Sequence, residues 1–424
     1  MLNIFKQEHP KGLYLLFFVE MWERFSYYGM RALIVLYMVQ TLMFSAQKAG
    51  SIYGLYTGFV YLTPLIGGYL ADRFLGQRKC ITAGAVLMSI GLFLLAFGSK
   101  SLFLLALFLM ITANGFFKSN ISSVLGLLYN NDNEKKDSAF TIFYMGINLG
   151  AFLSPLICGT LAVKFGYEYG FAAAGCGMLC GLTLYKLFEN RLLGEHGLKP
   201  STQKIEKTEY GDSASSKKQI ISLITLMLFT IPFWICFEQA GSSLTLFAEY
   251  QTNRHFFGHE IPTGYFQALN PLFIITLAPL ISVLWEKLRS INKEPTSVEK
   301  FAIALLIMAV AYVILTIAGS LSLSSEISPL WLILVYFVMT IAELCLSPIG
   351  LSLVSKLAPK KFLSLMMGCW FLTSFCGNIF AGIWGGEYES LNPVQLFTPL
   401  AILAFTACII LVCFIPKLNE TIKK

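Results

Sequence analysis

Long apolar stretches alternate with short polar breaks along the whole chain. A helix needs about 20 predominantly apolar residues to cross the hydrocarbon core of a bilayer, and each stretch is close to that length or longer. Because several stretches exceed it, tilted or kinked helices are expected. The pattern predicts an all-α membrane protein with twelve transmembrane helices, over residues 13–44, 47–74, 80–97, 101–128, 138–164, 167–189, 219–248, 261–286, 298–320, 328–358, 360–385 and 392–416.

The longest polar break, residues 190–218, is rich in Lys, Glu and Ser and separates six predicted helices from six. We therefore expect an N-terminal six-helix bundle over residues 1–189, a cytoplasmic linker over 190–218 and a C-terminal six-helix bundle over 219–424. Two six-helix halves joined by a polar loop predict a major facilitator superfamily fold. In that fold the solute site lies between the halves, near the middle of the membrane.

Composition and charge agree with a membrane protein and give its orientation. Charged residues make up 13% of the chain, against about 25% in soluble domains. If both termini are cytoplasmic, 24 of the 31 Lys and Arg residues lie in termini and loops on that side, and only 4 lie in loops on the other. Positive residues collect on the cytoplasmic side of membrane proteins. The net charge of +7 thus reflects the loops and does not indicate nucleic-acid binding.

Neither the cysteines nor the histidines indicate a catalytic or metal site. The ten cysteines show no zinc-ligand or loop-disulfide spacing, so we interpret them as reduced packing residues. All four histidines lie in terminal or loop positions, and the chain has no His-Glu-x-x-His, Gly-x-Ser-x-Gly or phosphate-loop motif. We expect a protein that is not an enzyme and that uses no metal or cofactor.

The first predicted helix carries four ionisable residues that share one helical face: Glu20, Glu23, Arg24 and Arg31. A charged side chain at the centre of a membrane helix costs roughly 2.5–3.5 kcal/mol on insertion scales. These four side chains must therefore face a polar interior and find partners. They form either a structural ion pair between helices or part of a pathway for a proton or a charged solute.

Three more ionisable residues, Lys118, Glu238 and Glu343, lie in the fourth, seventh and tenth predicted helices. The buried set then contains four acids and three bases. Because a low-dielectric interior penalises an uncompensated carboxylate, we expect at least one glutamate to hold a proton in one state. That deficit is a physical basis for proton coupling. The alternative is that Glu238 or Glu343 simply reaches water.

The opposite charges lie in different halves of the chain. A zwitterionic solute could place its carboxylate near Arg31 and Lys118 and its amine near Glu343, with bidentate contacts from the guanidinium. Alternatively, Arg31 and Glu238 pair with each other when the site is empty. The two roles are compatible, because a solute or proton that breaks the pair would release a gate.

Polar and aromatic residues accompany these charges inside the predicted helices. Any one of them could be a packing residue, but as a set they are typical of a polar, sequence-tolerant pocket. They are Tyr27, Tyr28, Tyr61, Tyr144, Asn148, Trp234, Asn270 and Trp370. At the cytoplasmic end of the second helix, Asp72 and Arg73 follow a pair of glycines and are expected to act in gating.

These residues occur in an ordered series of motifs that resembles the proton-dependent oligopeptide transporter (POT) family of the major facilitator superfamily. The series covers nearly the whole chain. It consists of Glu20-x-x-Glu-Arg-Phe-x-Tyr-Tyr-Gly, Gly67-Gly-x-x-Ala-Asp-Arg, Asn114-Gly-Phe-Phe-Lys, Phe143-Tyr-x-x-x-Asn-x-Gly, Phe233-Trp-x-x-x-Glu-Gln-Ala-Gly-Ser-Ser, Leu269-Asn-Pro-Leu-Phe and Glu343-Leu-x-x-Ser-Pro-x-Gly-Leu-Ser.

The resemblance implies import of di- and tripeptides with protons by alternating access, through a multi-pass protein of the cell (inner) membrane, and we expect a monomer. It assigns proton coupling to Glu20, Glu23, Arg24 and Glu238, and places the peptide carboxylate at Arg31 and Lys118. It places the amino end and backbone at Glu343, Asn270 and Asn148. The pocket would be lined by Tyr27, Tyr28, Tyr61, Trp234, Ser347 and Trp370.

Two features depart from the family pattern. Ser119 stands where a proline usually follows the lysine of the fourth helix, and residues 190–218 are too short and polar to hold the extra helix pair of many bacterial members. The first bears on the local shape around Lys118. Two other functions remain open, namely transport of another small anionic or zwitterionic solute and a peptide sensor that does not transport.

Overall fold

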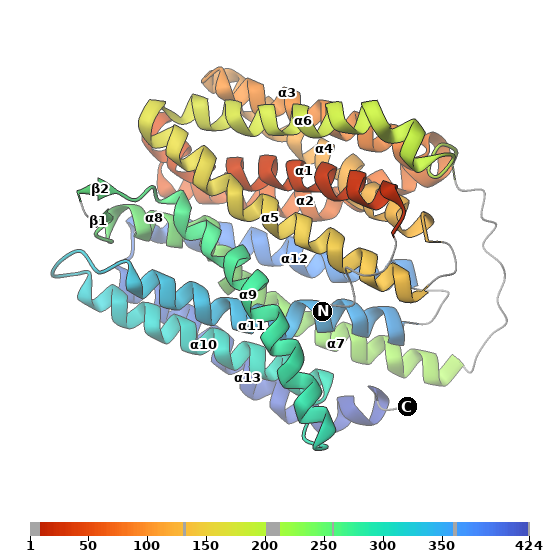
Figure 1. Cartoon of the computed structure of the whole chain (residues 1–424). Helices are drawn as coiled ribbons and strands as arrows, with labels where there is room; N and C mark the ends of the chain where they lie inside the picture. The colour runs from red at the N-terminus through yellow and green to blue at the C-terminus, as the bar shows by residue number, and fades with distance from the viewer. Residues whose placement is uncertain (1–8, 130–132, 201–212, 257, 359–362, 423–424) are drawn as a thin grey trace. The chain divides into compact units, whose positions relative to one another are not determined.

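The computed structural model describes residues 9–129, 133–200, 213–256, 258–358 and 363–422, almost all of them helical (Figure 1). Residues 201–212 of the predicted linker, and 360–362 of the predicted helix 360–385, lie outside the described residues. The α-helices are α1 (Lys11–Leu36), α2 (Ala46–Leu70), α3 (Gln77–Ala96), α4 (Lys100–Leu127), α5 (Asn133–Phe165), α6 (Tyr167–Leu193), α7 (Ser213–Phe237), α8 (Ser243–Tyr250), α9 (Gly264–Ser290), α10 (Ser297–Leu321), α11 (Leu330–Leu357), α12 (Leu363–Gly385) and α13 (Pro393–Ile422).

Short segments of other structure join or extend these helices. The π-helices η2 (Tyr37–Thr41) and η3 (Ala71–Leu75) continue α1 and α2, and the 3₁₀ segments η4 (Glu238–Gly241) and η6 (Gly386–Glu389) follow α7 and α12. The strands β1 (His255–Phe256) and β2 (His259–Glu260) pair antiparallel in the loop between α8 and α9.

Each of the twelve predicted transmembrane segments coincides with one helix or with consecutive helical segments of the described chain. Among these residues, ten helical segments are long and apolar enough to cross a membrane, with α7, η4 and α8 counted together. The other two segments are α1, which carries the four charges of the first motif, and α2, which is rich in glycine and tyrosine. The prediction of an all-α membrane protein is therefore confirmed.

The chain divides into two compact units. The first comprises Met1–Tyr37 and Phe59–Lys204. Within it α1 packs against α5 and α6, and α3 packs against α4 and α6. Small residues let these backbones approach closely, as is usual between membrane helices. A Cβ atom added at Gly150 of α5 would lie 2.2 Å from the carbonyl oxygen of Met21, so α1 and α5 touch where the charged motif begins.

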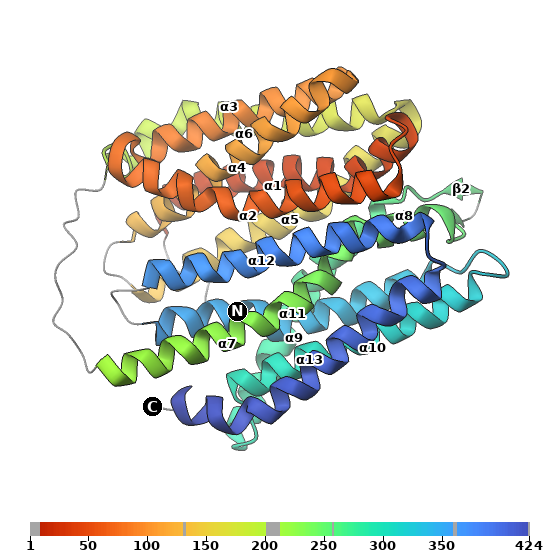
Figure 2. The ribbon, with the colours of Figure 1, turned by 180° about the vertical axis from the view of Figure 1, so that it is seen from behind.

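The second unit comprises Met38–Gly58 and Ile205–Lys424. Within it α10 packs against α11 and α13, α12 packs against α7, and α9 packs against α11 (Figure 2). Its hydrophobic core includes large side chains that are fully buried, among them Phe233, Phe301, Tyr312 and Phe397. These helices carry the second group of predicted site residues.

Candidate functional site

The first motif forms a compact charged group on α1. Nε of Arg24 lies 3.0 Å from Oε1 of Glu20, and the same guanidinium is paired with Glu23. All three side chains are at most 4% exposed. All three residues belong to α1, so these ion pairs lie within a single helix. Because one arginine is paired with two carboxylates, the group has one acid more than it has bases.

Helix α4 brings Asn114 against this group. Its Nδ2 donates to Oε1 of Glu23 at 3.5 Å, and the Asn114 side chain is fully buried. The backbone of α4 is held at this level by two neighbours. A Cβ at Gly67 of α2 would lie 1.9 Å from the carbonyl oxygen of Gly115, and one at Gly84 of α3 would lie 2.7 Å from that of Ala113. Sequence reasoning missed Asn114, although it stands one helical turn before Lys118 in the same motif.

Lys118 points toward an aromatic ring of α2. Its Nζ lies 4.5 Å from the ring centroid of Tyr61, within the range of a cation–π interaction. The next residue, Ser119, donates from Oγ to the carbonyl oxygen of Pro64 at 3.1 Å. The departure from the family pattern at Ser119 therefore adds a hydrogen bond between α4 and α2, next to the lysine.

Two tyrosines connect Arg24 to Arg31 along α1. The guanidinium carbon of Arg24 lies 5.6 Å from the ring centroid of Tyr27, and that of Arg31 lies 5.8 Å from the ring of Tyr28. The two rings meet edge to face with their centroids 5.2 Å apart. Arg31, predicted to bind the peptide carboxylate, and Arg24, predicted to couple protons, are thus connected through the contacts of these two rings.

Three other predicted residues of the first unit make local contacts. Asn148 donates from Nδ2 to the carbonyl oxygen of Tyr144 at 2.9 Å, within α5. Asp72 accepts from Nε2 of Gln77 at 2.7 Å, and Arg73 donates to the hydroxyl oxygen of Tyr69 at 2.9 Å. Both predicted gating side chains are exposed; Asp72 contacts the first residue of α3, and Arg73 contacts the end of α2.

In the second unit, Asn270 of α9 and Glu343 of α11 lie together. Nδ2 of Asn270 donates to Oε2 of Glu343 at 2.8 Å and to Oγ1 of Thr340 at 3.1 Å. Thr340 is fully buried, and its hydroxyl group donates a hydrogen bond to the carbonyl oxygen of Tyr336 at 2.7 Å. Thr340 is a second residue that sequence reasoning missed, and it fixes the direction of the Asn270 amide.

Glu238 lies where α7 gives way to η4, and it is 2% exposed. The next residue, Gln239, anchors this break. Its Nε2 donates to the carbonyl oxygens of Ile235 and Ala381, at 3.2 and 3.1 Å, and its Oε1 accepts from the hydroxyl of Ser243 at 2.5 Å. The backbone at Glu238 is therefore held by hydrogen bonds to both α7 and α12.

The two predicted pocket tryptophans are both buried. Trp234 meets Phe233 and Phe237 edge to face, with centroids 5.3 and 5.7 Å apart. Trp370 is 4% exposed and belongs to the hydrophobic core of the second unit. Its ring lies against Phe301, at a centroid distance of 6.4 Å, and against Gly350, where an added Cβ would fall 1.9 Å from Cη2.

Ser347 lies on α11, one helical turn before Gly350, and is half-buried. Its Oγ atom is buried and finds no hydrogen-bond partner within the described part of the chain.

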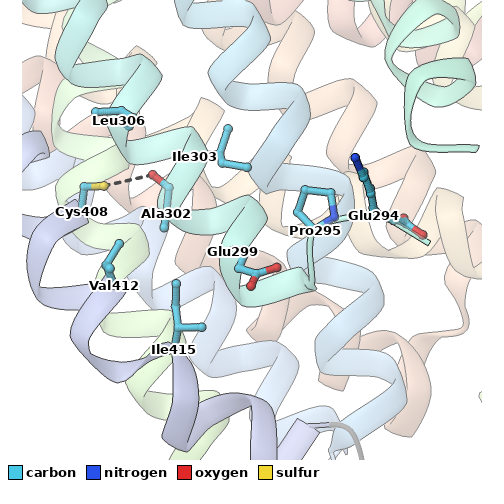
Figure 3. Close-up of a pocket in the computed structure, with 10 residues that line it drawn as sticks. Glu294, Pro295, Glu299, Ala302, Ile303, Leu306, Cys408, Val412 and Ile415 are labelled. Atoms are coloured by element: carbon cyan, nitrogen blue, oxygen red, sulfur yellow. Dashed lines mark hydrogen bonds between the residues drawn. The ribbon is translucent and has the colours of Figure 1, made fainter. Parts of the chain in front are cut away.

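A groove of about 480 Å³ lies elsewhere on the second unit, between α10, α13 and the loop before α10 (Figure 3). Its walls are mostly apolar, and across it Sγ of Cys408 donates to the carbonyl oxygen of Ala302 at 3.3 Å. The lining residues are Lys293, Glu294, Pro295, Glu299, Ala302, Ile303, Leu306, Cys408, Val412 and Ile415. This lining includes none of the predicted site residues.

Comparison with known proteins places the chain in a family. A model of the POT family matches residues 78–205 and 198–387. The peptide transporter YePEPT of Yersinia enterocolitica subsp. palearctica serotype O:3 (strain YE-P4) is 34% identical over 452 residues, which cover 90% of this chain and 88% of the relative. This chain belongs to the POT family.

Other POT-family similarities extend over almost the full length. The di-/tripeptide transporter of Lactococcus lactis subsp. lactis (strain IL1403) is 32% identical, over 95% of this chain and 94% of the relative. A crystal structure of a peptide transporter POT in complex with sulfate has a TM-score of 0.92 and 31% identity, and the match covers 98% of this chain and 96% of that one. The predicted major facilitator fold and family are confirmed. Because these relatives are transporters, the prediction that the chain is not an enzyme is also confirmed.

Proposed function

We propose that this POT-family protein imports di- and tripeptides together with protons, by alternating access, across the cell (inner) membrane. The observation that carries the proposal is the buried group of Glu20, Glu23 and Arg24, in which two carboxylates share one guanidinium. Burial disfavours an extra negative charge, so binding of a proton to one of the two carboxylates is favoured. Similarity to peptide transporters over nearly the full chain supports peptides as the solute.

The proposal gives each unit its own part of the substrate. In the first unit, Arg31 and Lys118 bind the peptide carboxylate, and both are cations placed near tyrosine rings. In the second, Glu343 and Asn270 form a hydrogen-bonded pair that suits the ammonium group and the first peptide unit. Glu238 is the proton-linked partner of Arg31.

The remaining predicted residues have supporting roles in this proposal. Asn148 contacts the peptide backbone, Asp72 and Arg73 act in gating, and the pocket walls come from Tyr27, Tyr28, Tyr61, Trp234, Ser347 and Trp370. The protein acts as a monomer with both termini in the cytoplasm, the orientation that the distribution of Lys and Arg favours.

Uptake into proteoliposomes tests the proposal. Purified protein is reconstituted, an inward acid gradient is imposed, and accumulation of a labelled dipeptide is followed with a panel of unlabelled di- and tripeptides as competitors. We expect accumulation that peptides reduce, that nitrate leaves unchanged and that a protonophore abolishes. Competition by nitrate alone would identify another solute, and peptide binding without uptake would identify a sensor. Either result contradicts the proposal.

A further inference from the structure

Asn114 is an uncharged residue placed against the charged group of α1. Its Nδ2 donates to Oε1 of Glu23 at 3.5 Å, while its Oδ1 is buried without a hydrogen-bond partner in the described residues. Oε2 of Glu20 is also buried without a hydrogen-bond partner in the described residues. In the described part of the chain, the NH₂ group of the Asn114 amide is therefore hydrogen-bonded and its C=O group is not.

The chemistry of an amide matches a group that gains and loses a proton. An ionised carboxylate only accepts hydrogen bonds, whereas a protonated carboxyl group also donates one. The NH₂ group of Asn114 serves the ionised state and its C=O group serves the protonated state. Leucine has the same approximate size and serves neither. In a buried site this difference is large, because water is not there to replace the lost partner.

Few charged residues act on the two glutamates of α1. Arg24 on the same helix and Lys118 on α4 interact electrostatically with both Glu20 and Glu23, and Glu23 also acts on Glu20. The charged residues of the other helices packed against α1, namely α3, α5 and α6, lie within about two turns of the helix ends. Asn114 therefore stands among the nearest polar neighbours of the glutamates, on the helix that also carries Lys118.

We propose that Asn114 is a positioning residue for proton coupling, which donates to Glu23 when the glutamate is charged and accepts from the carboxyl group when a proton is bound. The proposal rests on the proposed function. Because Lys118 follows Asn114 by one turn of α4, the same helix contacts both the proton-binding group and the proposed carboxylate site.

Four variants test the proposal in proteoliposomes, with gradient-driven uptake and counterflow at equal pH measured across external pH 5 to 8. Asn114→Leu removes both hydrogen-bonding functions, Asn114→Thr keeps a donor and an acceptor, and Asn114→Asp adds negative charge. Asn120→Leu is the matched control: Asn120 is a buried asparagine of the same helix whose amide donates to the backbone carbonyls of Gly67 and Phe116, at 3.4 and 2.8 Å.

We expect Asn114→Leu to move the pH midpoint of driven uptake to higher pH by about one unit, because the lost hydrogen bond to the charged carboxylate is stronger than the lost hydrogen bond to the neutral carboxyl group, and a tenfold change in proton affinity is one pH unit. Counterflow should persist. Asn114→Asp should move the midpoint to higher pH, while Asn114→Thr and Asn120→Leu should leave it in place. An unchanged midpoint in Asn114→Leu, or an equal shift in Asn120→Leu, would overturn the proposal.

If the leucine variant does not fold, the aspartate and threonine variants decide, because equal midpoints in these two would also overturn the proposal. A wild-type protein that accumulates no peptide under a gradient would instead contradict the proposed function. The two failures are therefore distinguishable.

Discussion

The side-chain amide of Asn270 donates a 2.8 Å hydrogen bond to the carboxylate of Glu343, and this bond joins α9 to α11. The amide is oriented from behind by Thr340, whose Oγ1 accepts from the same nitrogen at 3.1 Å. Under the proposed function, this hydrogen-bonded pair binds the ammonium group of a peptide, so the orientation of the Asn270 amide should affect peptide binding.

Thr340→Val should weaken peptide binding without abolishing transport. The substitution keeps the shape of the side chain but removes the acceptor that orients Asn270, which costs about 0.5–1.5 kcal/mol. We expect the KM for dipeptides to rise by roughly 2- to 10-fold with little change in kcat, measured by initial rates of uptake. Thr316→Val is the control, since Thr316 bonds a backbone carbonyl of α10 in the same manner. Equal KM values in the two variants would contradict a positioning role for Thr340.

Gly67→Ala should separate α2 from α4 at the level of Lys118. The added Cβ would lie 1.9 Å from the carbonyl oxygen of Gly115, and a backbone atom cannot move aside as a side chain can. We expect a lower melting temperature of the solubilised protein and slower uptake. Gly68→Ala is the neighbouring control, because among the described residues its Cβ would meet only the Ser119 side chain, with Oγ at 3.4 Å and Cβ at 3.8 Å. If both alanine variants behave alike, the close approach of these helices is not important.

Glu294 should give a pH-dependent contribution to stability in the loop before α10. Hydrogen bonds from Arg289 and then Lys300, at 2.6 and 2.7 Å, lower the pKa of Glu294 to about 2. Its pKa in an unfolded chain is about 4.3. A lowered pKa means that the carboxylate stabilises the fold fully above the unfolded value, and that this stabilisation is lost as the pH falls toward the folded value.

Thermal unfolding of Glu294→Gln against wild type measures this effect. The difference in melting temperature should be constant between pH 8 and pH 6 and should shrink as the pH falls below about 4. Glu299→Gln is the control, since Glu299 caps α10 through the backbone N–H of Thr296, and glutamine can cap in the same manner. A difference that widens on acidification would show that the assigned direction of the pKa shift is wrong.

Trp370 and Gly350 should contribute to stability as one unit. Trp370→Ala leaves a cavity against Phe301 and is expected to cost about 3–5 kcal/mol of unfolding free energy. Gly350→Val forces the indole ring away from α11, because an added Cβ would lie 1.9 Å from that ring. In contact pairs such effects are not additive. The double variant should therefore lose less than the sum of the two single losses, and additive losses would contradict this packing.

The helices and the charged residues could be predicted because both follow from the cost of placing polar groups in lipid. Uncharged polar residues carry no such signal. Thr57 and Ser89 bond carbonyl oxygens of their own helices. Nothing in their sequence context separates them from Asn114, which contacts Glu23, or from Thr340, which contacts Asn270.

Two structural details also depend on tertiary contacts rather than on composition. The break at η4 falls inside an apolar run, and it is held by hydrogen bonds from Gln239 that reach a different helix. Similarly, an aromatic residue in an apolar helix can face a pocket or the core. The burial of Trp370 between Phe301 and Gly350 follows from packing partners that lie far away in sequence.

The central claim is that the buried glutamates of α1 tie proton entry to peptide entry. The most direct test measures proton entry and peptide entry in the same proteoliposomes, with a pH-sensitive dye inside and a labelled dipeptide outside, at a fixed membrane potential that is negative inside. Addition of peptide should acidify the interior of wild-type vesicles. Glu23→Gln vesicles should show no acidification and no accumulation while still exchanging peptide in counterflow. Peptide accumulation without acidification in the wild type, or unchanged acidification in Glu23→Gln, would contradict the account.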